Sequence, residues 1–387
     1  MIWFVVVLAL LWGGYATFGK RWRIAPLLGP TSTSLAEGRV IAVVPARNEA
    51  GELPHTLPSL LRQSHRELTV IVVDDHSSDG TGEVARRIAA ELGASESLIV
   101  MTPPALPPGW AGKVWAQHHG VEHARSLGAD WLWLTDADIR HDPDVLERLL
   151  ATAERLRRDF VSIMARLRCQ NMFEKLLIPA FTYFFAGLYP FPQTGDDRSS
   201  EAGAAGGCVL VRTEVLERIG GLVAIRDAVI DDVSLGRACK RAGARLWLGY
   251  HDGVNSTRGY DTLADIWNMV ARSAYTQLRY SPLALAACVV GLAYVFFGPV
   301  AAIIWGAGAT RLWGLLAYAA MVWTYSPMVT YLGCAPGWAL LLPLSAALYT
   351  GMTVSSAWRH HLGAGAAWKG RSYTPASKAP QANTNPD

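Results

Sequence analysis

Charged side chains are almost missing from two long parts of this 387-residue chain. Met1 to Gly19 contains none, and the segment from Ser281 to Trp358 contains only Arg311. A helix that crosses a bilayer needs about 20 apolar residues, so both parts have the length and composition of membrane segments. Charged residues make up 17% of the chain, a low share for a soluble protein, and these two parts account for it.

The chain also lacks a strong excess of either charge and lacks paired-cysteine motifs. Its formal net charge of +3 gives no electrostatic basis for a nucleic-acid partner. The five cysteines form no CxxC pair and no metal-ligand spacing, so free thiols are expected. The pairs His118–His119 and His360–His361 are adjacent instead of four residues apart, which favours surface or interfacial histidines over metal ligands.

The N-terminal apolar segment lacks the features of a cleaved signal peptide. No positive charge precedes it, and no small-residue cleavage site is present. Lys20, Arg21 and Arg23 follow it, which by the positive-inside rule predicts an uncleaved transmembrane anchor over residues 1–19. The expected location is a bacterial-type inner (cell) membrane, crossed more than once, with the main domain on the cytoplasmic face.

The C-terminal apolar part, residues 283–358, contains three runs: Leu283–Ile304, Leu312–Leu332 and Trp338–Trp358. Three spans would place the basic residues of the tail, 359–387, outside the cell, against the positive-inside rule. Either one run does not span or the rule fails, and the sequence leaves both open. The residues from Pro375 onward are rich in Ala, Pro, Asn and Ser and are predicted to be disordered.

Between the apolar ends, residues 39–280 alternate strand and helix signals. Four apolar runs are predicted strands: Arg39–Ala46, Leu68–Asp75, Ser97–Met101 and Asp130–Asp136. Continuous apolar strands that alternate with helices predict an α/β fold, Rossmann-like, with a mostly parallel sheet covered on both faces. Three of these strands end in polar residues, and ligands of such sheets bind beyond the carboxyl ends of the strands. The strand ends therefore predict a binding site.

One uncharged stretch inside this domain, Leu176–Gly195, is long enough to span a bilayer, but three prolines interrupt it. A single crossing there would put Asp136 and Asp232 on opposite sides of the membrane. We therefore interpret residues 176–195 as an interfacial or re-entrant segment under the domain. A buried core helix is the alternative.

Asp136 and Asp138 follow the fourth predicted strand with one residue between them. Two carboxylates at this spacing can reach one hard divalent cation, Mg²⁺ or Mn²⁺, which shares its remaining ligands with substrate phosphates. Such a pair alone is more often a solvated turn, but its place at a strand end favours the metal site. Lys113, after a Gly- and Pro-rich loop, can meet a phosphate as a point charge; a plain surface lysine is the alternative.

Asp231 and Asp232 begin a predicted helix that continues through Ala238. One acid is enough to cap the helix, which leaves the other free for chemistry. Neighbouring carboxylates raise each other's pKa, which suits a general base near neutral pH. After the second strand, Asp75 is predicted to accept hydrogen bonds from a base or ribose, and the next helix is predicted to be capped by Asp79 and Thr81.

Six segments in this order resemble the family-2 glycosyltransferases of the GT-A fold: VVPARNE, VVDDHSSDGT, TDADIRHDP, GAAGGCVLVRTEVLERIGG, IDDVSLGRACKRAG and TQLRY. The likeness covers about Arg39 to Ser281. With GKVWAQHHG and WKGRSY, the chain is most similar to the membrane glycosyltransferases associated with hopanoid biosynthesis. It is more distantly similar to ceramide glucosyltransferases and carotenoid glycosyltransferases.

The resemblance implies a role for each matching residue. Residues that would bind the donor, a nucleoside-diphosphate sugar of the UDP type, are Pro45, Arg47, Glu49, Asp75, Lys113, Asp136 and Arg279. Asp136 and Asp138 would also hold the metal, with Asp138 the closer ligand. Asp232, next to Asp231, would be the catalytic base. The acceptor would be contacted by Gly206, Gly207 and Tyr280, because backbone without side chains can approach the sugar closely.

One motif departs from the family pattern. The family has Gln-x-x-Arg-Trp near the membrane, whereas this chain has Gln277-Leu278-Arg279-Tyr280, one residue shorter and with Tyr for Trp. Arg279 can still grip the leaving diphosphate, but stacking by Tyr280 is put in doubt. Because polymer-forming members keep the full motif, the change favours transfer of a single sugar.

The resulting hypothesis is an inverting, metal-dependent glycosyltransferase of the hexosyltransferase type that acts on a hydroxyl of a membrane lipid. A hopanoid acceptor is implied by the resemblance alone. A polyprenyl-phosphate acceptor is the first alternative, although an acceptor that is already an anion needs no strong base. A non-catalytic lipid-binding protein of the same fold is the second alternative, and it would be expected to lose the metal-binding acids or the base.

Overall fold

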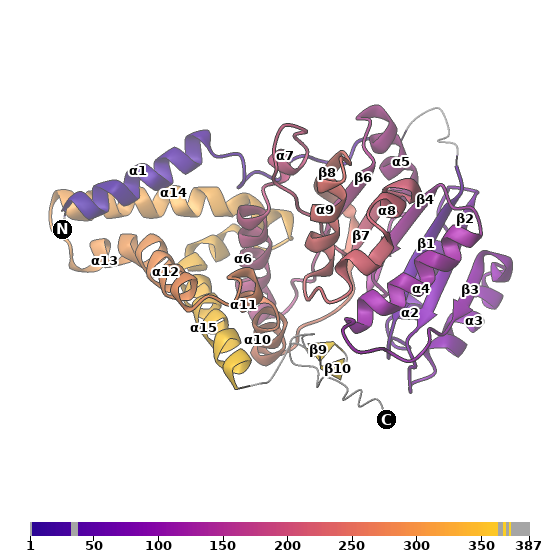
Figure 1. Cartoon of the computed structure of the whole chain (residues 1–387). Coiled ribbons are helices and arrows are strands. Elements are labelled where there is room, and N and C mark those ends of the chain that lie inside the picture. Colours follow the sequence, from indigo (N-terminus) through magenta and orange to yellow (C-terminus); the bar gives the residue numbers. More distant parts are fainter. Residues whose placement is uncertain (1, 32–37, 363–366, 369–370, 373–387) are drawn as a thin grey trace, which may run out of the picture. The chain divides into compact units, whose positions relative to one another are not determined.

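The computed structural model describes residues 2–31, 38–362, 367–368 and 371–372, and it separates into two compact units (Figure 1). The sheet unit contains Leu28–Ala165 and Ala202–Thr257. The helical unit combines three separate parts of the chain: Met1–Leu27, Arg166–Glu201 and Arg258–Ala364. The region predicted as one domain, residues 39–280, is therefore shared between the units. The tail predicted to be disordered lies outside the described residues.

The sheet unit is built on one eight-stranded sheet in the order β3-β2-β1-β4-β7-β6-β8-β5. Its parallel strands match the four predicted ones: β1 (Val40–Ala46), β2 (Leu68–Asp74), β3 (Leu98–Met101) and β4 (Trp131–Thr135). The sheet continues with strands that were not singled out in the sequence: β5 (Ile139–His141), β6 (Phe160–Arg166), β7 (Cys208–Arg212) and β8 (Leu246–Ser256). β7 pairs antiparallel with β4 and β6, and β5 pairs antiparallel with β8.

Helices cover both faces of this sheet, as Figure 1 shows for the sheet unit. Ala42 and Val44 pack on one face with the helices α2 (Leu53–Leu61), α3 (Thr81–Glu91) and α5 (Val145–Arg155). Ile41 and Val43 pack on the other face with α4 (Gly112–Ser126), α8 (Thr213–Arg218) and α9 (Asp231–Arg241). Successive strand residues face opposite sides, so a strand buried on both faces must be apolar throughout. The continuous apolar runs therefore predicted this layered arrangement correctly.

The carboxyl ends of β1, β2 and β4 meet at one edge of the sheet. Parallel pairing places Ala46 beside Asp74, and Val43 beside Leu134. The polar residues that follow these strands therefore leave the same edge, as the sequence predicts.

The helical unit contains the apolar ends of the chain and a central part. Its main helices are α1 (Ile2–Phe18), α6 (Met172–Leu188), α10 (Leu263–Ala271), α12 (Pro282–Leu292), α13 (Gly298–Trp305), α14 (Ala309–Tyr331) and α15 (Leu342–His361). Within the described residues, two stretches are long and apolar enough to cross a membrane, Pro282–Trp305 and Pro336–His361. The predicted N-terminal anchor, α1, is a shorter apolar helix of 17 residues.

Helix α1 is joined to the C-terminal helices by hydrogen bonds between residues almost 300 positions apart. The indole of Trp12 donates to the carbonyl of Val295 at 3.1 Å, and the hydroxyl of Tyr294 donates to the carbonyl of Phe4 at 2.7 Å. The rings of Trp12 and Phe296 also meet edge to face, with centroids 5.7 Å apart. The two ends of the chain therefore form one packed structure.

Helix α6 contains most of the stretch that was predicted to be interfacial or re-entrant. Pro179 lies inside the helix instead of ending it, although proline cannot donate the backbone hydrogen bond of a helix. Hydroxyl groups of α15 support the helix here, because Ser345 donates to the carbonyl of Leu176 and Tyr349 to that of Leu177. One face of α6 is buried in the helical unit, which is the packing expected of the alternative, a buried core helix.

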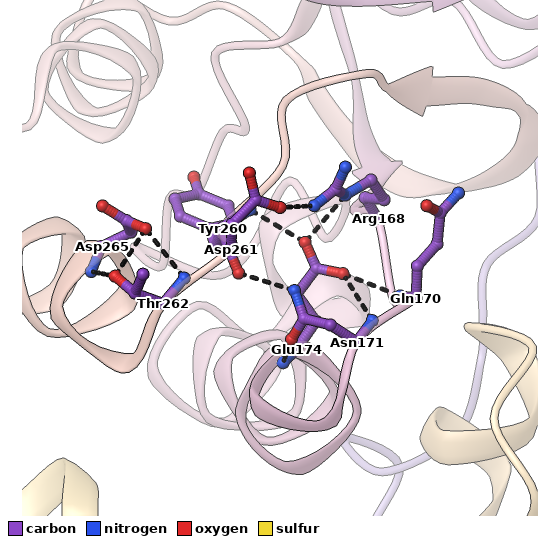
Figure 2. A network of polar contacts seen from close by, with 8 residues as sticks. All are labelled: Arg168, Gln170, Asn171, Glu174, Tyr260, Asp261, Thr262 and Asp265. Carbon is purple, nitrogen blue, oxygen red and sulfur yellow. Dashed lines mark hydrogen bonds and ion pairs between the residues drawn. The ribbon is translucent and has the colours of Figure 1, made fainter.

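A polar network around Glu174 holds the start of α6 (Figure 2). Asn171 accepts the N–H of Glu174, and Glu174 accepts the N–H of Asn171, which is a capping box. The carboxylate of Glu174 is fully buried and also accepts the Tyr260 N–H and the Arg168 Nε–H, both at 2.8 Å. Arg168 in turn pairs with Asp261 at 2.6 Å. The network therefore ties the segments around residues 168 and 260 to one helix.

Candidate active site

An ammonium group and two carboxylates from three separate motifs meet in the sheet unit. Lys113 Nζ lies 2.8 Å from Asp136 Oδ1 and 3.1 Å from Asp231 Oδ2. Lys113 comes from the first turn of α4, Asp136 follows β4, and Asp231 begins α9. The side chains are only 16%, 31% and 20% exposed. Lys113 therefore links the predicted metal-binding acids to the predicted catalytic acids.

The charges of this cluster shift the pKa values of its members. Burial opposes the charge of Lys113, but the carboxylates of Asp136 and Asp231 outweigh it and hold the pKa of Lys113 above its usual value. Burial raises the pKa of Asp136; Lys113 opposes the rise, and the charges of Asp138 and Asp231 add to it. The acids outnumber the single ammonium, so the cluster has an excess of negative charge.

Asp232 holds the backbone of the predicted acceptor loop. Its Oδ2 accepts the N–H of Gly206 at 2.8 Å, and its Oδ1 accepts the N–H of Val233 at 2.7 Å. Burial, followed by the charge of Asp231, raises the pKa of Asp232 to about 6. A carboxylate with such a pKa is ionised at neutral pH and is still basic enough to take a proton.

The helix start at Asp231 differs from the prediction that one acid of the pair serves as the cap. Ile230 is the N-cap residue and makes no side-chain cap, while Asp231 and Asp232 both lie in the first turn. Asp232 accepts the N–H of Val233, which has no partner within the first turn of the helix, and Asp231 pairs with Lys113. Negative charge in a first turn is favourable because it faces the positive end of the helix dipole. Both acids therefore support the helix without either being its cap.

Gly206 and Gly207 stand where an added Cβ atom would be in tight contact with its neighbours. A Cβ atom at Gly206 would lie 3.3 Å from Asp232 Cβ and 3.4 Å from Lys113 Nζ, and one at Gly207 would lie 3.1 Å from Ile139 Cδ1. Glycine at these two positions therefore lets the loop lie close to Asp232 and Lys113. The role of this loop toward an acceptor remains a prediction.

His141 is a buried residue of this region to which the sequence analysis gave no role. Its Nε2 lies 2.9 Å from Thr135 Oγ1, and that hydroxyl donates to the carbonyl of Gly207 at 2.8 Å. Because the one hydroxyl hydrogen goes to Gly207, His141 must donate its Nε2–H to Thr135. Burial lowers the pKa of His141 to about 3, so the ring is neutral. In the sequence, only the presence of a histidine in TDADIRHDP could have drawn attention to this position, and that alone does not predict its partner or its role.

The ends of β1 and β2 supply the residues predicted to bind the nucleotide. Arg47 Nη1 donates to the carbonyl of Asp75 and lies 3.7 Å from its Oδ2. Asp75 is fully buried, Glu49 is buried with its N–H on Thr81 Oγ1 at 3.0 Å, and Pro45 is buried within β1. These four predicted residues lie at neighbouring strand ends. Their role toward a nucleotide remains a prediction.

Asn48 and Asp74 belong to the polar strand ends that predict the binding site, although neither residue was given a role of its own. Asn48 Oδ1 accepts the N–H of Ser78, and Asp74 accepts the N–H groups of Ser77 and Gly82. Asn48 has a φ of 52°, a left-handed conformation that costs of order 1 kcal/mol and that asparagine adopts more readily than most other residues.

The start of α3 is capped in a different way from the prediction. Gly80, with a φ of 81°, is the N-cap residue, a backbone conformation that suits glycine. Asp79 accepts the N–H of Thr81 at 3.1 Å and also its hydroxyl, so the two predicted residues bond to each other beside the cap.

Arg279 and Tyr280 belong to the helical unit. Both have left-handed backbone, with φ of 51° and 56°. Tyr280 stacks on His360 with ring centroids 4.4 Å apart, and its hydroxyl accepts from Thr276 at 3.0 Å. Stacking on a histidine of the chain is a local role for the tyrosine that replaces the family's tryptophan. Contacts of Arg279 and Tyr280 with a donor or an acceptor remain predictions.

The cysteines and the histidine pair of α4 stand apart from this chemistry. All five cysteines are free, as predicted. His118 and His119 are half-buried and lie against the ring of Trp115, with centroids 5.9 and 4.3 Å away. Burial lowers the pKa of both histidines, which fits packing residues.

Comparison with known proteins gives a consistent result. Residues 41–220 match the sequence model described as Glycosyl transferase family 2. An undecaprenyl-phosphate mannosyltransferase of Micrococcus luteus is 41% identical over 113 residues, which are 29% of this chain and 43% of that protein. A 4,4'-diaponeurosporenoate glycosyltransferase of Staphylococcus haemolyticus is 31% identical over 146 residues, 37% of this chain and 35% of that protein. The chain thus spans less than half the length of these relatives.

A solved structure extends the likeness beyond these segments. The mannosyltransferase PcManGT of Pyrobaculum calidifontis, in complex with GDP-Man and Mn²⁺, has a TM-score of 0.52 and 20% identity, covering 93% of this chain and 99% of that chain. At this identity the likeness shows the fold, which is GT-A. Residues 41–220 therefore match glycosyltransferase family 2, and the likeness to PcManGT together with the sheet topology shows the GT-A fold.

Proposed function

We propose that this protein transfers one sugar from a nucleoside-diphosphate donor to a hydroxyl group of a membrane lipid, with inversion at the anomeric carbon. The observation that carries the proposal is the cluster in which Lys113 bridges Asp136 and Asp231, next to Asp232. It joins acids suited to a metal-bound diphosphate with an acid suited to a general base. A lipid-binding protein without activity would have no need for this combination.

The donor would lie beyond the ends of β1, β2 and β4, with its base and ribose toward Asp75 and Arg47. The resemblance favours a UDP-sugar. The relative solved with GDP-Man makes a GDP-sugar the second donor to test. The diphosphate would point to Asp136 and Asp138.

The residues present fit a divalent cation. Within the described ranges, no three His, Cys, Asp or Glu side chains form a group that could hold a metal ion. Mg²⁺ and Mn²⁺ at phosphate sites commonly use only one or two carboxylates, and the substrate and water provide the other ligands. Burial raises the pKa of Asp136 most, and the negative charges of Asp138 and Asp231 add to the rise, so a cation would relieve this repulsion. When bound, the ion neutralises the charge that develops on the leaving diphosphate.

Asp232 would activate the acceptor. Its carboxylate would take the proton of the lipid hydroxyl while the oxygen attacks the anomeric carbon and the bond to the diphosphate breaks. Lys113 pairs with Asp231 and Asp136 and holds both side chains in place, and the N–H of Gly206 fixes the orientation of Asp232. A direct displacement of this kind inverts the anomeric centre.

A second acceptor class has support from one specific observation. The Micrococcus luteus relative is named for undecaprenyl phosphate. A phosphate acceptor is already an anion, however, and would leave Asp232 without a proton to remove. We therefore favour a lipid hydroxyl, with a hopanoid alcohol as the first candidate and a polyprenyl phosphate as the second.

The helical unit would hold the protein in a cell membrane of bacterial type, with the sheet unit on the cytoplasmic face. Two stretches of this unit have the length and composition of spans. Large apolar side chains are exposed along α1 and α13, for example Trp3 at 77%, Phe18 at 84% and Trp305 at 76%. Contact with lipid would cover this surface.

The proposed reaction can be tested on lipids. We expect cells that express the gene to contain a lipid carrying one additional sugar, detected by mass spectrometry and absent from cells expressing the Asp232→Asn variant. Mild acid distinguishes the two acceptors, because a sugar on a lipid phosphate is released and a glycoside of a lipid hydroxyl is stable. A product released by mild acid would favour the polyprenyl-phosphate acceptor. If no new glycolipid forms with any UDP- or GDP-sugar that is supplied, the proposal is contradicted.

The orientation has its own test. Lys20, Arg21 and Arg23 directly after an apolar segment predict that the chain enters the cytoplasm there. A reporter enzyme that is active only in the cytoplasm, fused after Pro30, should therefore be active. A fusion that is well expressed and inactive would show the opposite orientation.

A further inference from the structure

The turn that carries the predicted metal-binding acids is held from two sides. Thr56 of α2 donates its hydroxyl to the carbonyl of Ala137 at 2.7 Å. On the other side, Thr257 donates its N–H to the carbonyl of Asp138 at 2.8 Å. This bond extends the ladder between β5 and β8, in which Ile139 pairs with Ser256. The position of Asp138 therefore depends on residues far away in the sequence.

The hydroxyl of Thr257 connects this turn to Glu52. It lies 3.0 Å from the carbonyl oxygen of Asp138 and 2.7 Å from Glu52 Oε2. A hydroxyl has one hydrogen, so the shorter bond to the carboxylate is the stronger one. Glu52 directly precedes α2, and its own carbonyl oxygen lies 3.2 Å from Thr56 Oγ1. Glu52 therefore connects the two residues that hold the turn.

We infer that Glu52 and Thr257 are positioning residues that fix the backbone of Asp138 so that its carboxylate can hold a divalent cation on the donor diphosphate. The inference rests on the proposed function of Asp136 and Asp138. The contacts of Thr56 and Thr257 are made to backbone carbonyls, so they act through the turn. Asp138 is only 8% exposed, so a buried carboxylate misplaced by a tilted turn could not recover its contacts by swinging through solvent.

Partners of this kind have a measurable effect at metal sites. Loss of a group that orients a metal ligand typically costs 10–100-fold in metal affinity or activity. A residue that only stabilised the fold would change the melting temperature and leave metal affinity unchanged. The two roles can therefore be separated by measuring metal affinity directly.

The test compares full-length variants for Mn²⁺-dependent nucleotide binding, measured by calorimetry with UDP and with GDP. Thr257→Val removes the hydroxyl and keeps the N–H and the shape, and Glu52→Gln removes the charge at nearly the same size. We expect each to raise the Mn²⁺ concentration for half-maximal nucleotide binding at least 10-fold. The double variant should be no worse than the weaker single variant, because Glu52→Gln removes the charge that strengthens the bond from Thr257 and Thr257→Val removes the hydroxyl that makes it, so both changes act on the same bond. Nucleotide binding in the presence of EDTA should not change.

Two further variants give matched controls. Thr257→Ser keeps a hydroxyl at this position. Its Mn²⁺ requirement should therefore lie within about twofold of the parent, in contrast to the change of at least 10-fold expected for Thr257→Val. Thr152→Val makes the same substitution at a buried threonine of α5 whose hydroxyl has no hydrogen-bond partner among the described residues, and it should leave the requirement unchanged.

Several results would overturn the inference. One is an unchanged Mn²⁺ requirement in Thr257→Val and Glu52→Gln proteins that melt like the parent. If Thr257→Val does not fold, Glu52→Gln with a parental Mn²⁺ requirement has the same meaning. If the parent binds nucleotide equally well with Mn²⁺ and with EDTA, the proposed metal site itself fails and the inference fails with it. Measuring nucleotide binding by the parent with Mn²⁺ and with EDTA, before any variant is made, distinguishes failure of the metal site from failure of the inference about Glu52 and Thr257.

Discussion

Replacing Asp232 with asparagine is expected to slow sugar transfer about 10²–10⁴-fold while the affinity for the donor nucleotide stays close to that of the parent. Asparagine has the same size and keeps one oxygen for an N–H of Gly206 or Val233, but it cannot take a proton from an acceptor hydroxyl. Burial raises the pKa of Asp232, so its charged form at pH 7 is less favourable in the folded than in the unfolded chain. Removing the charge should therefore not unfold the domain.

The measurement is the initial rate of glycolipid formation, together with nucleotide binding and the melting temperature. Because the pKa of Asp232 is about 6, kcat/KM of the parent should fall as the pH drops below about 6 and the base becomes protonated. Asp231→Asn should reduce the rate less, and it should move this acid limb to lower pH by removing the charge that helps raise the pKa of Asp232. A near-parental rate for Asp232→Asn, or an unmoved limb in Asp231→Asn, would assign the base elsewhere.

The second large effect is expected from Asp138→Asn. Loss of one charged ligand from a mostly buried site should cost about 2–3 kcal/mol, which is roughly 30–150-fold in nucleotide affinity when Mn²⁺ or Mg²⁺ is present. With EDTA the variant and the parent should bind equally, because the carboxylate would act on the nucleotide only through the cation. Calorimetry under both conditions gives the two affinities.

Asp142→Asn is a matched control for this experiment. It is the same substitution four residues further on, at an exposed side chain. It should bind nucleotide like the parent with and without metal. If Asp138→Asn also keeps parental affinity in the presence of Mn²⁺, the pair of acids is a turn without a metal.

The sequence predicted the parallel strands well because their burial on both faces requires unbroken apolar runs. Their polar ends then necessarily meet at one edge, which is why Arg47, Asp75 and Asp136 were assigned to one site. Among the antiparallel strands, β7 was missed although it has five residues like β4, and β8, with eleven residues, mixes apolar residues with Gly, His, Asp and Asn, which hides its strand character. Helix α6 was interpreted as interrupted at Pro179, since support from hydroxyls of α15 is invisible in the local sequence.

Within the candidate site, the residue types were predictable and their partners were not. Lys113 was expected to meet a phosphate, but it pairs with Asp136 and Asp231, which only the sheet order brings to it. The bond from Gly206 to Asp232 spans 26 residues, and the bond from Thr257 to Glu52 spans 205. His141 received no role, because a single buried histidine has no pattern that points to Thr135. Contacts between residues so far apart in the sequence leave no periodic pattern in the sequence from which they could be predicted.

The pairing of α1 with the C-terminal helices has a consequence for the order in which the protein can be made. The bond from Trp12 to Val295 joins residues 283 positions apart. At a synthesis rate of about 5–20 residues per second, the first helix waits roughly 15–60 s before its partners leave the ribosome. During that time its apolar surface needs another neighbour, which in the proposed location is lipid. A chain that ended before Tyr294 would lack these partners and leave α1 in that waiting state permanently, even with every residue of the sheet unit in place.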